Sequence, residues 1–594
     1  MPTYTAPIRD MRFVVYELFG AADTLTALPG YEEASADLID AVLEECGKLC
    51  EGVLAPINQS GDEEGCRFDD GAVTTPTGFK EAYKQFAEGG WCGLTASPEY
   101  GGQGLPETLQ YLIDEMVGSA NLSFGLYPGL TQGTIICLSA HGTDEQKQTY
   151  IPRLVSGEWQ GTMCLTEPHA GSDLGLLRAK AAPNGDGTYA ITGTKIFISA
   201  GEHDMTDNFV HLVLARLPDA PEGSRGISMF LVPKFLVNDD GSLGERNAAA
   251  AGSIEHKMGM KASVTCVMNF DGAKGWLIGK EHKGLAGMFT MMNKERLFVG
   301  TQGISQAETA YQNATAYAKD RIQGRAAGGA KQPDKAADSI LVHPDIRNKL
   351  LFSKSIIEAE RALAVWTQLN VDIAHAHGDD TVRERAGDME ALMTPIIKSA
   401  CTDFGTEITN ACLQVFGGHG YISEWGMEQL VRDVRITQIY EGTNTIQALD
   451  LVGRKLGLHD GRLFDGLLDE INQSLTAAEG RNDLAEFVVP FKDAVERLKA
   501  TTDWLRVQAN DDPDALGAAA NDYLRMFALT VFAWMWVRMA EKALDASTTG
   551  DEFYETKLQV GRYFMTRVLP GTVSLEAVIK SGAVPMMALS QDAF

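Results

Sequence analysis

A single carboxylate stands out in the stretch QIYEGTNTIQ, which runs from Gln438 to Gln447. Glu441 lies there between the aromatic Tyr440 and Gly442, and an apolar helical stripe resumes after it. A carboxylate in such a place can decorate the N-terminus of a helix, or it can be a base aimed into a pocket. The local pattern leaves both interpretations open.

The common catalytic fingerprints are missing from the sequence. It has no GxGxxG that opens a strand–helix unit, no GxxxxGK(S/T) and no GxSxG elbow. His375 and His377 are two residues apart, which places them on different faces of a helix, so we expect no shared metal. The glycine clusters Gly101–Gly104 (GGQG) and Gly417–Gly420 (GGHG) therefore need another explanation.

Composition and charge narrow the function classes. The 594 residues are 44% hydrophobic and 22% charged, which is ordinary for a globular protein of several packed units. The formal net charge of -29 repels nucleic-acid phosphates and anionic lipid, so we expect neither nucleic-acid nor membrane binding. An anionic ligand would need a locally basic pocket.

Cysteine usage and apolar runs indicate a cytoplasmic protein. Nine scattered cysteines without a CxxC pair or a metal-like Cys/His cluster fit reduced thiols. The first twenty residues lack the apolar core of a signal peptide. The longest apolar run, Met526–Val537, is shorter than the ~20 residues of a membrane span and predicts a buried helix.

The elements that must position these residues follow a helix–strand–helix plan. Helical periodicity dominates to about residue 160, as in Ala34–Cys50 and Thr108–Ala120, and returns from Gly284 onward. Between them, the predicted strands are Tyr189–Ile196, Val210–Leu217, Ile227–Val232 and Ser263–Phe270. The predicted later helices are Phe289–Arg321, Pro344–Ala376, Arg383–Phe416, Asp514–Leu544 and Glu552–Val568. Val237–Ser253 and Gly324–Ala337, rich in Gly, Ala and charge, are interpreted as inserted loops.

We therefore expect a mainly α fold with a central β-domain. The predicted domains are an N-terminal arm (1–35), an N-terminal helical domain (36–160), a middle antiparallel β-domain (161–283), a helical bundle that carries the Glu441 stretch (284–456) and an extra C-terminal helical domain (457–594). The last domain holds no chemical constellation, so its sequence favours a structural or oligomer-covering role.

Five short segments, in order, resemble the acyl-CoA dehydrogenase family of flavoproteins. They are MCLTEPHAGSD (Met163–Asp173), KIFISAG (Lys195–Gly201), DRIQGR (Asp320–Arg325), LQVFGGHGY (Leu413–Tyr421) and RDVRITQIYEGT (Arg432–Thr443). Each is a weak signal alone, whereas five in the family's order on this ground plan make a strong one. The resemblance covers roughly residues 36 to 456. The arm and the helical tail are similar to a longer bacterial branch that includes 3-methylmercaptopropionyl-CoA dehydrogenases and long- or broad-chain enzymes.

The resemblance implies FAD-dependent dehydrogenation of an acyl-CoA thioester to the trans-2-enoyl-CoA. A base removes an α-proton while the flavin N5 takes a hydride from the β-carbon. Glu441 matches the family's base by type and by position in YEGT, and burial would raise the pKa of such a carboxylate. The Glu441 amide and a flavin ribityl hydroxyl would donate to the thioester carbonyl, and Gly442 would let the backbone approach the ligand.

The same matching implies which residues hold FAD. The flavin ring would meet the backbone of Met163 and Leu165, the hydroxyls of Thr166 and Ser199, and the Phe197 side chain. Arg321 and Gln323 would hold phosphate oxygens. Gln414, Gly417 and Gly418 would hold the adenosine diphosphate part across a dimer interface, and Thr443 and Thr445 would also touch it. Arginine supplies the positive charge that an acidic protein needs for this. Many relatives carry Trp at position 197, and Phe197 keeps the apolar face but lacks the indole N–H. Ser199 replaces a common Thr as a hydroxyl donor. Many relatives have Gln at position 445, where Thr445 is the departure that puts a contact in doubt.

For the thioester, the resemblance implies contacts along a tunnel. Ser172 would bond the pantetheine chain, Asn293 and Arg296 would line the tunnel, and Tyr440 and Gly442 would flank the base. Taken singly, Phe197 could be core, Ser172 a helix cap and Arg296 half of a surface ion pair.

Glu295 is a rival base. It directly precedes Arg296 in MNKERL, and some branches of the family place the catalytic Glu there. We favour Glu441 because its whole YEGT context is intact. Glu295 would then be a CoA-side carboxylate or a partner of Lys294 or Arg296.

The expected enzyme is a cytoplasmic homodimer or homotetramer that passes electrons to electron-transferring flavoprotein. Its substrate would be 3-methylmercaptopropionyl-CoA, from dimethylsulfoniopropionate, or a fatty acyl-CoA. An acyl-CoA oxidase that uses dioxygen is an alternative with the same chemistry on the thioester. A flavin-containing nucleic-acid-binding relative is another, against which the charge of -29 argues.

Overall fold

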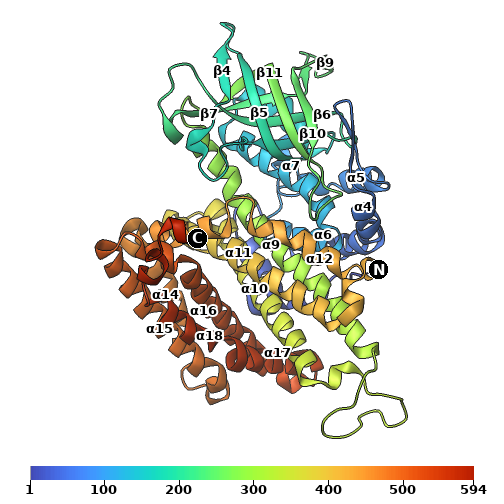
Figure 1. Ribbon diagram of the computed structural model, residues 1–594, viewed down its shortest axis with the longest axis vertical. Coiled ribbons are helices and arrows are strands. Elements are labelled where there is room, and N and C mark those ends of the chain that lie inside the picture. The colour runs from blue at the N-terminus through green and yellow to red at the C-terminus, as the bar shows by residue number, and fades with distance from the viewer. Residues whose placement is uncertain (1) are drawn as a thin grey trace. The chain divides into compact units, whose positions relative to one another are not determined.

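The computed structural model describes residues 2–594, which fall into two compact units (Figure 1). One unit, here the helical unit, holds residues 2–44, Glu107–Glu115 and Val299–Phe594. The other, here the sheet unit, holds Glu45–Pro106 and Met116–Phe298. Helices α3 (Ala36–Leu49), α6 (Glu107–Ala120) and α9 (Gly284–Asp320) contribute residues to both units.

The helical unit is built around three long helices. Its other helices are α1 (Ile8–Arg12), α2 (Ala21–Thr26), α12 (Met427–Val434), α13 (Asn444–Gly453), α14 (Arg462–Ala477), α15 (Ala485–Asp511), α17 (Glu552–Tyr563), α18 (Gly571–Ile579) and α19 (Val584–Met587). Helix α10 (Pro344–Ala376) packs along α11 (Asp380–Val415), and α16 (Ala515–Ala546) packs against both of them and against α13, α15, α17 and α18 (Figure 1).

Helix boundaries in this unit follow ordinary capping chemistry. Pro344 occupies the first turn of α10, where its missing N–H costs nothing. The Asp379 carboxylate caps α11 by accepting the Thr381 N–H at 2.8 Å. The apolar run Met526–Val537 is buried in the middle of α16, which confirms the predicted buried helix. Within residues 2–594, every helix is too short or too polar to cross a bilayer.

A cluster of buried charges ties distant parts of the helical unit together. The Arg361 guanidinium of α10 donates to Glu115 at 2.5 Å, to Glu308 at 2.7 Å and to Asp10 at 2.5 Å. Asp10 also pairs with the Lys557 ammonium of α17. Burial raises the pKa of Glu115. For Asp10, the opposing effect of burial is outweighed by Lys557 and Arg361, so its pKa lies well below the usual range.

The sheet unit carries helices α4 (Asn58–Glu64), α5 (Phe79–Glu88), α7 (Leu122–His141) and α8 (Asp144–Val155) beside a seven-stranded sheet. The sheet strands are β3 (Trp159–Cys164), β4 (Lys180–Pro183), β5 (Tyr189–Ser199), β6 (Asn208–Arg216), β7 (Ile227–Pro233), β10 (Ala249–Ile254) and β11 (Thr265–Ile278). They run in the order β10-β11-β5-β4-β6-β3, and β7 pairs with β11 and β6. Helix α7 packs against β3.

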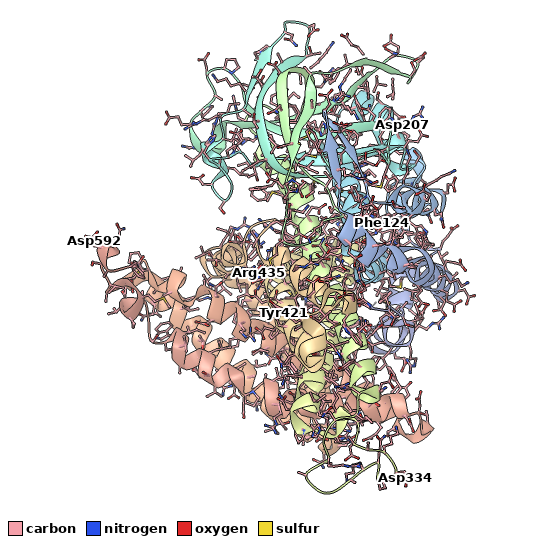
Figure 2. All side chains as sticks on the ribbon, turned by 45° about the vertical axis from the view of Figure 1, so that its right-hand side comes forward. Phe124, Asp207, Asp334, Tyr421, Arg435 and Asp592 are labelled. Carbon is pink, nitrogen blue, oxygen red and sulfur yellow. The ribbon has the colours of Figure 1, made fainter. Side chains whose placement is uncertain are left out.

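The predicted fold class is confirmed, with additions. Most strand pairings are antiparallel, but β3 and β4 each pair with β6 in parallel. A small hairpin of β1 (Arg67–Asp69) and β2 (Ala72–Thr74) was not predicted. The predicted loop Gly324–Ala337 is a loop, tied at its end by the buried Asp338, and Figure 2 labels Asp334 within it.

The prediction of a loop at Val237–Ser253 is wrong. It contains β9 (Leu243–Arg246), which pairs with β8 (Phe235–Val237), and most of β10. Its Ala- and Gly-rich sequence has low strand propensity. Pairing of β10 with β11 decides the structure instead, because that contact buries Ala249 and Ala251.

Candidate active site

The Glu441 loop joins α12 to α13 in the helical unit and has a constrained backbone. Glu441 has φ +55° and Gly442 has φ +83°, so two consecutive residues are left-handed. A non-glycine residue pays for this conformation in steric strain, and such residues gather at functional sites. The N-cap of α13 is Thr443, whose hydroxyl accepts the Ile446 N–H at 3.3 Å. Glu441 is therefore not the helix cap.

Buried amides hold this loop in place. Gln447 Nε2 donates to the carbonyl oxygens of Glu441 and Gly442, at 3.3 and 3.2 Å. Asn444 donates to Asp403 at 2.7 Å and to the Thr402 hydroxyl at 2.9 Å. These contacts attach the loop to α11 and leave Glu441 only half-buried.

Two further predicted ligand residues, Tyr440 and Thr445, precede and follow Glu441 in the chain. The Tyr440 hydroxyl donates to the side-chain oxygen of Gln302 on α9. Thr445 is exposed on the first turn of α13. Tyr440 and Gln302 both belong to the helical unit.

A hollow of about 480 Å³ in the helical unit gathers five predicted cofactor residues. Its lining is Tyr317, Arg321, Gln323, Ile340, His343, Ile346, Gln414, Val415, Phe416, Gly417, Gly418 and His419. A Cβ at either Gly417 or Gly418 would meet nothing within 4 Å, so backbone at these glycines faces open space. Arg321 supplies the expected local positive charge. Thr443 and Thr445, which were predicted to touch the same part of the cofactor, do not line this hollow.

Sequence reasoning missed the aromatic wall of this hollow. The rings of Tyr317 and Phe416 stack with centroids 4.2 Å apart, and the Tyr317 hydroxyl lies 2.9 Å from His419 Nδ1. Tyr317 lies in the last turn of α9, and Arg321 directly follows the helix and donates its N–H to the Tyr317 carbonyl at 2.8 Å. This four-residue spacing continues the helical pattern and places both residues on one side of the helix end. The spacing could have pointed to Tyr317. An aromatic wall beside a cation suits a ligand with a flat ring and phosphates.

The sheet unit brings together the residues predicted to face the flavin ring. Leu165 and Thr166 follow β3 directly, and the Thr166 carbonyl accepts the Ile196 N–H of β5 at 2.9 Å. Among the described residues, neither the Leu165 N–H nor the Thr166 N–H donates to a protein acceptor. Two adjacent peptide donors are therefore available to a ligand.

Phe197 and Ser199 lie on β5 beside this segment. Phe197 has φ +60° and a side chain 60% exposed, so it is not a core residue. Ala200, directly after β5, also has a left-handed backbone, with φ +53°. Strained backbone thus recurs at a second predicted ligand segment.

Lys195 and Glu167 form a buried ion pair that sequence reasoning did not single out as functional. Lys195 Nζ is 2.8 Å from Glu167 Oε1 and 2.9 Å from the Leu165 carbonyl oxygen. Glu167 also accepts the N–H groups of Arg178 and Ala179, at 2.7 and 3.0 Å. Burial alone would raise the pKa of Glu167, but Lys195 and these N–H groups outweigh burial and lower it.

Three of the predicted substrate residues, Ser172, Asn293 and Arg296, belong to the sheet unit. Ser172 is exposed and caps nothing, because the neighbouring Asp173 caps the short helix that follows. Asn293 is exposed on α9, whereas Arg296 is only 7% exposed, which rules out a surface ion pair. Glu295 is 4% exposed, and its Oε1 lies so close to Gly133 of α7 that a Cβ there would come within 2.5 Å.

Two buried histidines, His203 and His211, make hydrogen bonds inside the sheet unit. His211 Nδ1 lies 2.7 Å from the Thr162 hydroxyl, and His203 accepts the Met205 N–H at 3.2 Å. Burial, with a smaller effect of Lys234, lowers the pKa of each histidine to about 3. Among the described residues, no group of His, Cys, Asp and Glu is arranged to hold a metal ion.

Comparison with known proteins extends these observations over nearly the whole chain. Family models match residues 39–158 (acyl-CoA dehydrogenase, N-terminal domain), 162–273 (middle domain), 282–456 (C-terminal domain) and 467–590 (acetyl-CoA dehydrogenase C-terminal like).

Two curated relatives and one solved structure are also similar to the chain. A 3-methylmercaptopropionyl-CoA dehydrogenase of Ruegeria pomeroyi is 43% identical over 96% of each chain. A broad-specificity linear acyl-CoA dehydrogenase of Mycobacterium tuberculosis is 34% identical over the full length of both. The structure of an acyl-CoA dehydrogenase complexed with FAD from Bacillus anthracis aligns with a TM-score of 0.74 at 22% identity, over 98% of this chain and 93% of that one. At that identity the likeness concerns the fold.

Proposed function

This chain belongs to the acyl-CoA dehydrogenase family, and from that premise we propose that it uses FAD to remove a proton and a hydride from adjacent carbons of an acyl-CoA thioester. The observation that carries this proposal is the left-handed backbone of Glu441, at φ +55°, in a loop held by buried amides. Such strain persists only where the surroundings hold it, and here it fixes the position of one carboxylate.

The residues present fit FAD. In the helical unit, the hollow offers Arg321 for phosphate and the Tyr317 and Phe416 rings for a flat base. In the sheet unit, the free N–H groups of Leu165 and Thr166 suit the acceptor atoms along a flavin edge. When bound, FAD supplies the acceptor for the hydride that leaves the β-carbon.

The chain's own residues supply the remaining steps. Glu441 takes the α-proton onto a carboxylate oxygen, and the carboxylate becomes a carboxylic acid. The Glu441 N–H donates to the thioester carbonyl, which stabilises the negative charge that develops on that oxygen as the proton leaves. Gly442 leaves room for the thioester beside the loop. Ser172, Asn293 and Arg296 bind the CoA part of the substrate.

The substrate we propose is 3-methylmercaptopropionyl-CoA. The support is the relative of that name from Ruegeria pomeroyi, which is 43% identical over 96% of both chains. A linear fatty acyl-CoA is the competing substrate, supported by the 34% identical relative from Mycobacterium tuberculosis. A thioester panel distinguishes the two.

We also propose a cytoplasmic homo-oligomer of two or four copies that transfers electrons to electron-transferring flavoprotein. Exposed apolar side chains next to the hollow in sequence support self-association: Tyr421 is 83% exposed, and Ile422 and Trp425, which follow it within four residues, are exposed as well. Figure 2 shows Tyr421 in the helical unit. The bounds of the five predicted domains stay predictions.

Anaerobic titration of the purified protein with acyl-CoA thioesters tests the reaction. The panel holds short, long, branched, aryl and 3-methylmercaptopropionyl thioesters. We expect loss of the oxidised flavin absorbance with at least one member, and the strongest response to 3-methylmercaptopropionyl-CoA. If no thioester bleaches the flavin, the proposed reaction is wrong. Rapid reoxidation of the bleached enzyme in air would identify an oxidase instead.

A further inference from the structure

A fully buried lysine controls the segment that would receive the flavin edge. Lys195 is 0% exposed, and its ammonium reaches both the Leu165 carbonyl and the Glu167 carboxylate. Burying a charge is costly, and a buried ion pair adds little net stability compared with apolar side chains of similar volume. The pair therefore calls for a reason beyond stability.

The geometry of the Leu165–Thr166 peptide supplies that reason. Its carbonyl oxygen points at Lys195 Nζ, 2.9 Å away. In a trans peptide the C=O and N–H bonds point in opposite directions, so the Thr166 N–H points away from the lysine. This N–H has no acceptor among the described residues. Lys195 thus sets the direction in which a free peptide donor faces.

The charge on Lys195 also acts on that donor. A cation at a carbonyl oxygen draws electron density across the peptide, which makes the N–H at its other end a stronger hydrogen-bond donor. Glu167 keeps the ammonium in place, since its carboxylate is itself anchored by the Arg178 and Ala179 N–H groups. Lys195 of β5, the Leu165 carbonyl, the Glu167 carboxylate and the Arg178 and Ala179 N–H groups therefore form one connected set of polar contacts.

We propose that Lys195, held by Glu167, is a positioning residue that orients and polarises the Leu165–Thr166 peptide toward the flavin ring, and so stabilises the reduced over the oxidised cofactor. This inference rests on the proposed function. A stronger N–H donor favours the more electron-rich, reduced ring. Removing the charge should therefore lower the midpoint potential of bound FAD without abolishing FAD binding.

The test replaces the pair as a unit, because Lys195→Met alone would leave a buried carboxylate without its cation. One double variant is Lys195→Met/Glu167→Gln, which removes the charge and the contact with the Leu165 carbonyl. A second, Lys195→Gln/Glu167→Gln, keeps a neutral donor. The matched control is Lys234→Met/Glu202→Gln, which removes another ion pair of the sheet unit, 2.6 Å long, with little exposure.

We expect the Met/Gln variant to bind reduced FAD at least tenfold less tightly relative to oxidised FAD, which lowers the two-electron midpoint potential by about 30 mV or more. The Gln/Gln variant should show a smaller shift, and the control pair none. The visible absorption bands of bound FAD should move in the same order, and kcat should fall while KM stays within twofold.

An unchanged potential and spectrum in a Met/Gln variant that still binds FAD would overturn the proposal and leave Lys195 a structural residue. If that variant does not fold, the Gln/Gln variant decides in the same way. A crystal structure of either variant adds a readout without turnover: the Leu165 carbonyl should turn away from position 195 only in the Met/Gln protein. Failure of the proposed function is distinct, because wild-type flavin would then not be bleached by any thioester.

Discussion

Gln447 donates its side-chain amide to the carbonyl oxygen of Glu441 at 3.3 Å, from the second turn of the helix that follows. The buried Gln447 side chain thus fixes the backbone that carries the Glu441 carboxylate. Gln447 is fully buried, and its Nε2 also reaches the Gly442 carbonyl. Two left-handed residues in a row are therefore fixed by one amide.

Replacing Gln447 should misplace the base without removing it. We expect Gln447→Met to lower kcat by ~10- to 100-fold, since a displacement of about 1 Å at a catalytic group can cost that much. The loss of two hydrogen bonds should lower the free energy of unfolding by about 1–2 kcal/mol. Single-turnover flavin reduction measures the first effect and denaturant unfolding the second. Arg454→Gln, at the exposed C-cap of the same helix, is the control, and equal kinetic effects in both variants would contradict the interpretation.

The two candidate bases are separated by matched variants. Glu441→Gln should slow flavin bleaching by substrate by ~100- to 10,000-fold, the usual contribution of a general base. Glu295→Gln should leave the rate within a few-fold, because its carboxylate is packed against Gly133 of α7. Stopped-flow absorbance under anaerobic conditions gives both rates. The reverse pattern would transfer the catalytic role to Glu295.

Arg321 should carry much of the affinity for the cofactor phosphates. A charge-assisted hydrogen bond contributes about 1.5–3 kcal/mol, so we expect Arg321→Met to weaken FAD binding by ~10- to 100-fold. The wild-type Kd should also rise more steeply with salt than the variant Kd, since salt screens the Arg321 charge that the variant lacks. Fluorescence titration of apoprotein measures both. Lys331→Met, in the exposed loop Gly324–Ala337, should leave the Kd unchanged; a similar loss there would indicate a diffuse field instead of a phosphate contact.

The buried histidines should make the sheet unit sensitive to acid. His203 and His211 have a pKa of about 3 in the folded protein, below their ordinary value of 6.5, so the unfolded chain binds more protons between these values. The two histidines make their full contribution to the free energy of unfolding above pH 6.5. This free energy falls as the pH drops toward 3, by about 1.4 kcal/mol per pH unit for each histidine. Urea unfolding at pH 6.5, 5.5 and 4.5 measures this slope. His203→Gln/His211→Asn should flatten it, and an unchanged slope would assign acid sensitivity to other groups.

Arg361 should be among the most sensitive positions for stability. Arg361→Met leaves the buried Glu115 and Glu308 carboxylates without their cation, which should cost about 3–5 kcal/mol. Lys499→Met breaks only an exposed pair with Asp503 and should cost less than about 1 kcal/mol. Thermal and denaturant unfolding of both variants give the comparison. Equal losses would mean that the buried cluster is no stronger than a surface pair.

Periodicity predicted the elements more accurately than it predicted their environment. Helix α10 has the predicted bounds Pro344–Ala376, because a long amphipathic helix signals itself locally. The strand β10 was missed because its Ala-rich sequence becomes a strand only through pairing with β11. Five residues around the hollow were grouped by resemblance, whereas its Tyr317–Phe416 wall joins α9 to the end of α11, which lie far apart in the chain.

The same limit applies to Lys195 and Asp338. Nothing in KIFISAG distinguishes a lysine that points at the Leu165 carbonyl from one that points at solvent, because strand alternation gives a face and no partner. Asp338 accepts the N–H groups of Ala326, Lys331 and Gln332. These hydrogen bonds order a loop whose composition gave no sign of an ordered structure. Such contacts depend on three-dimensional closure of the chain.

The Asp10–Lys557 pair spans 547 residues of sequence. A ribosome that adds about 5–20 residues per second needs roughly half a minute to two minutes to separate the synthesis of these two side chains. During that interval the Asp10 carboxylate exists without one of its two cations, and the first helix has no completed binding surface. The contacts between the first helix and α17 can therefore form only when translation is nearly finished, after the contacts of the N-terminal segment with Gln312, Asn313 and Arg361 have become possible.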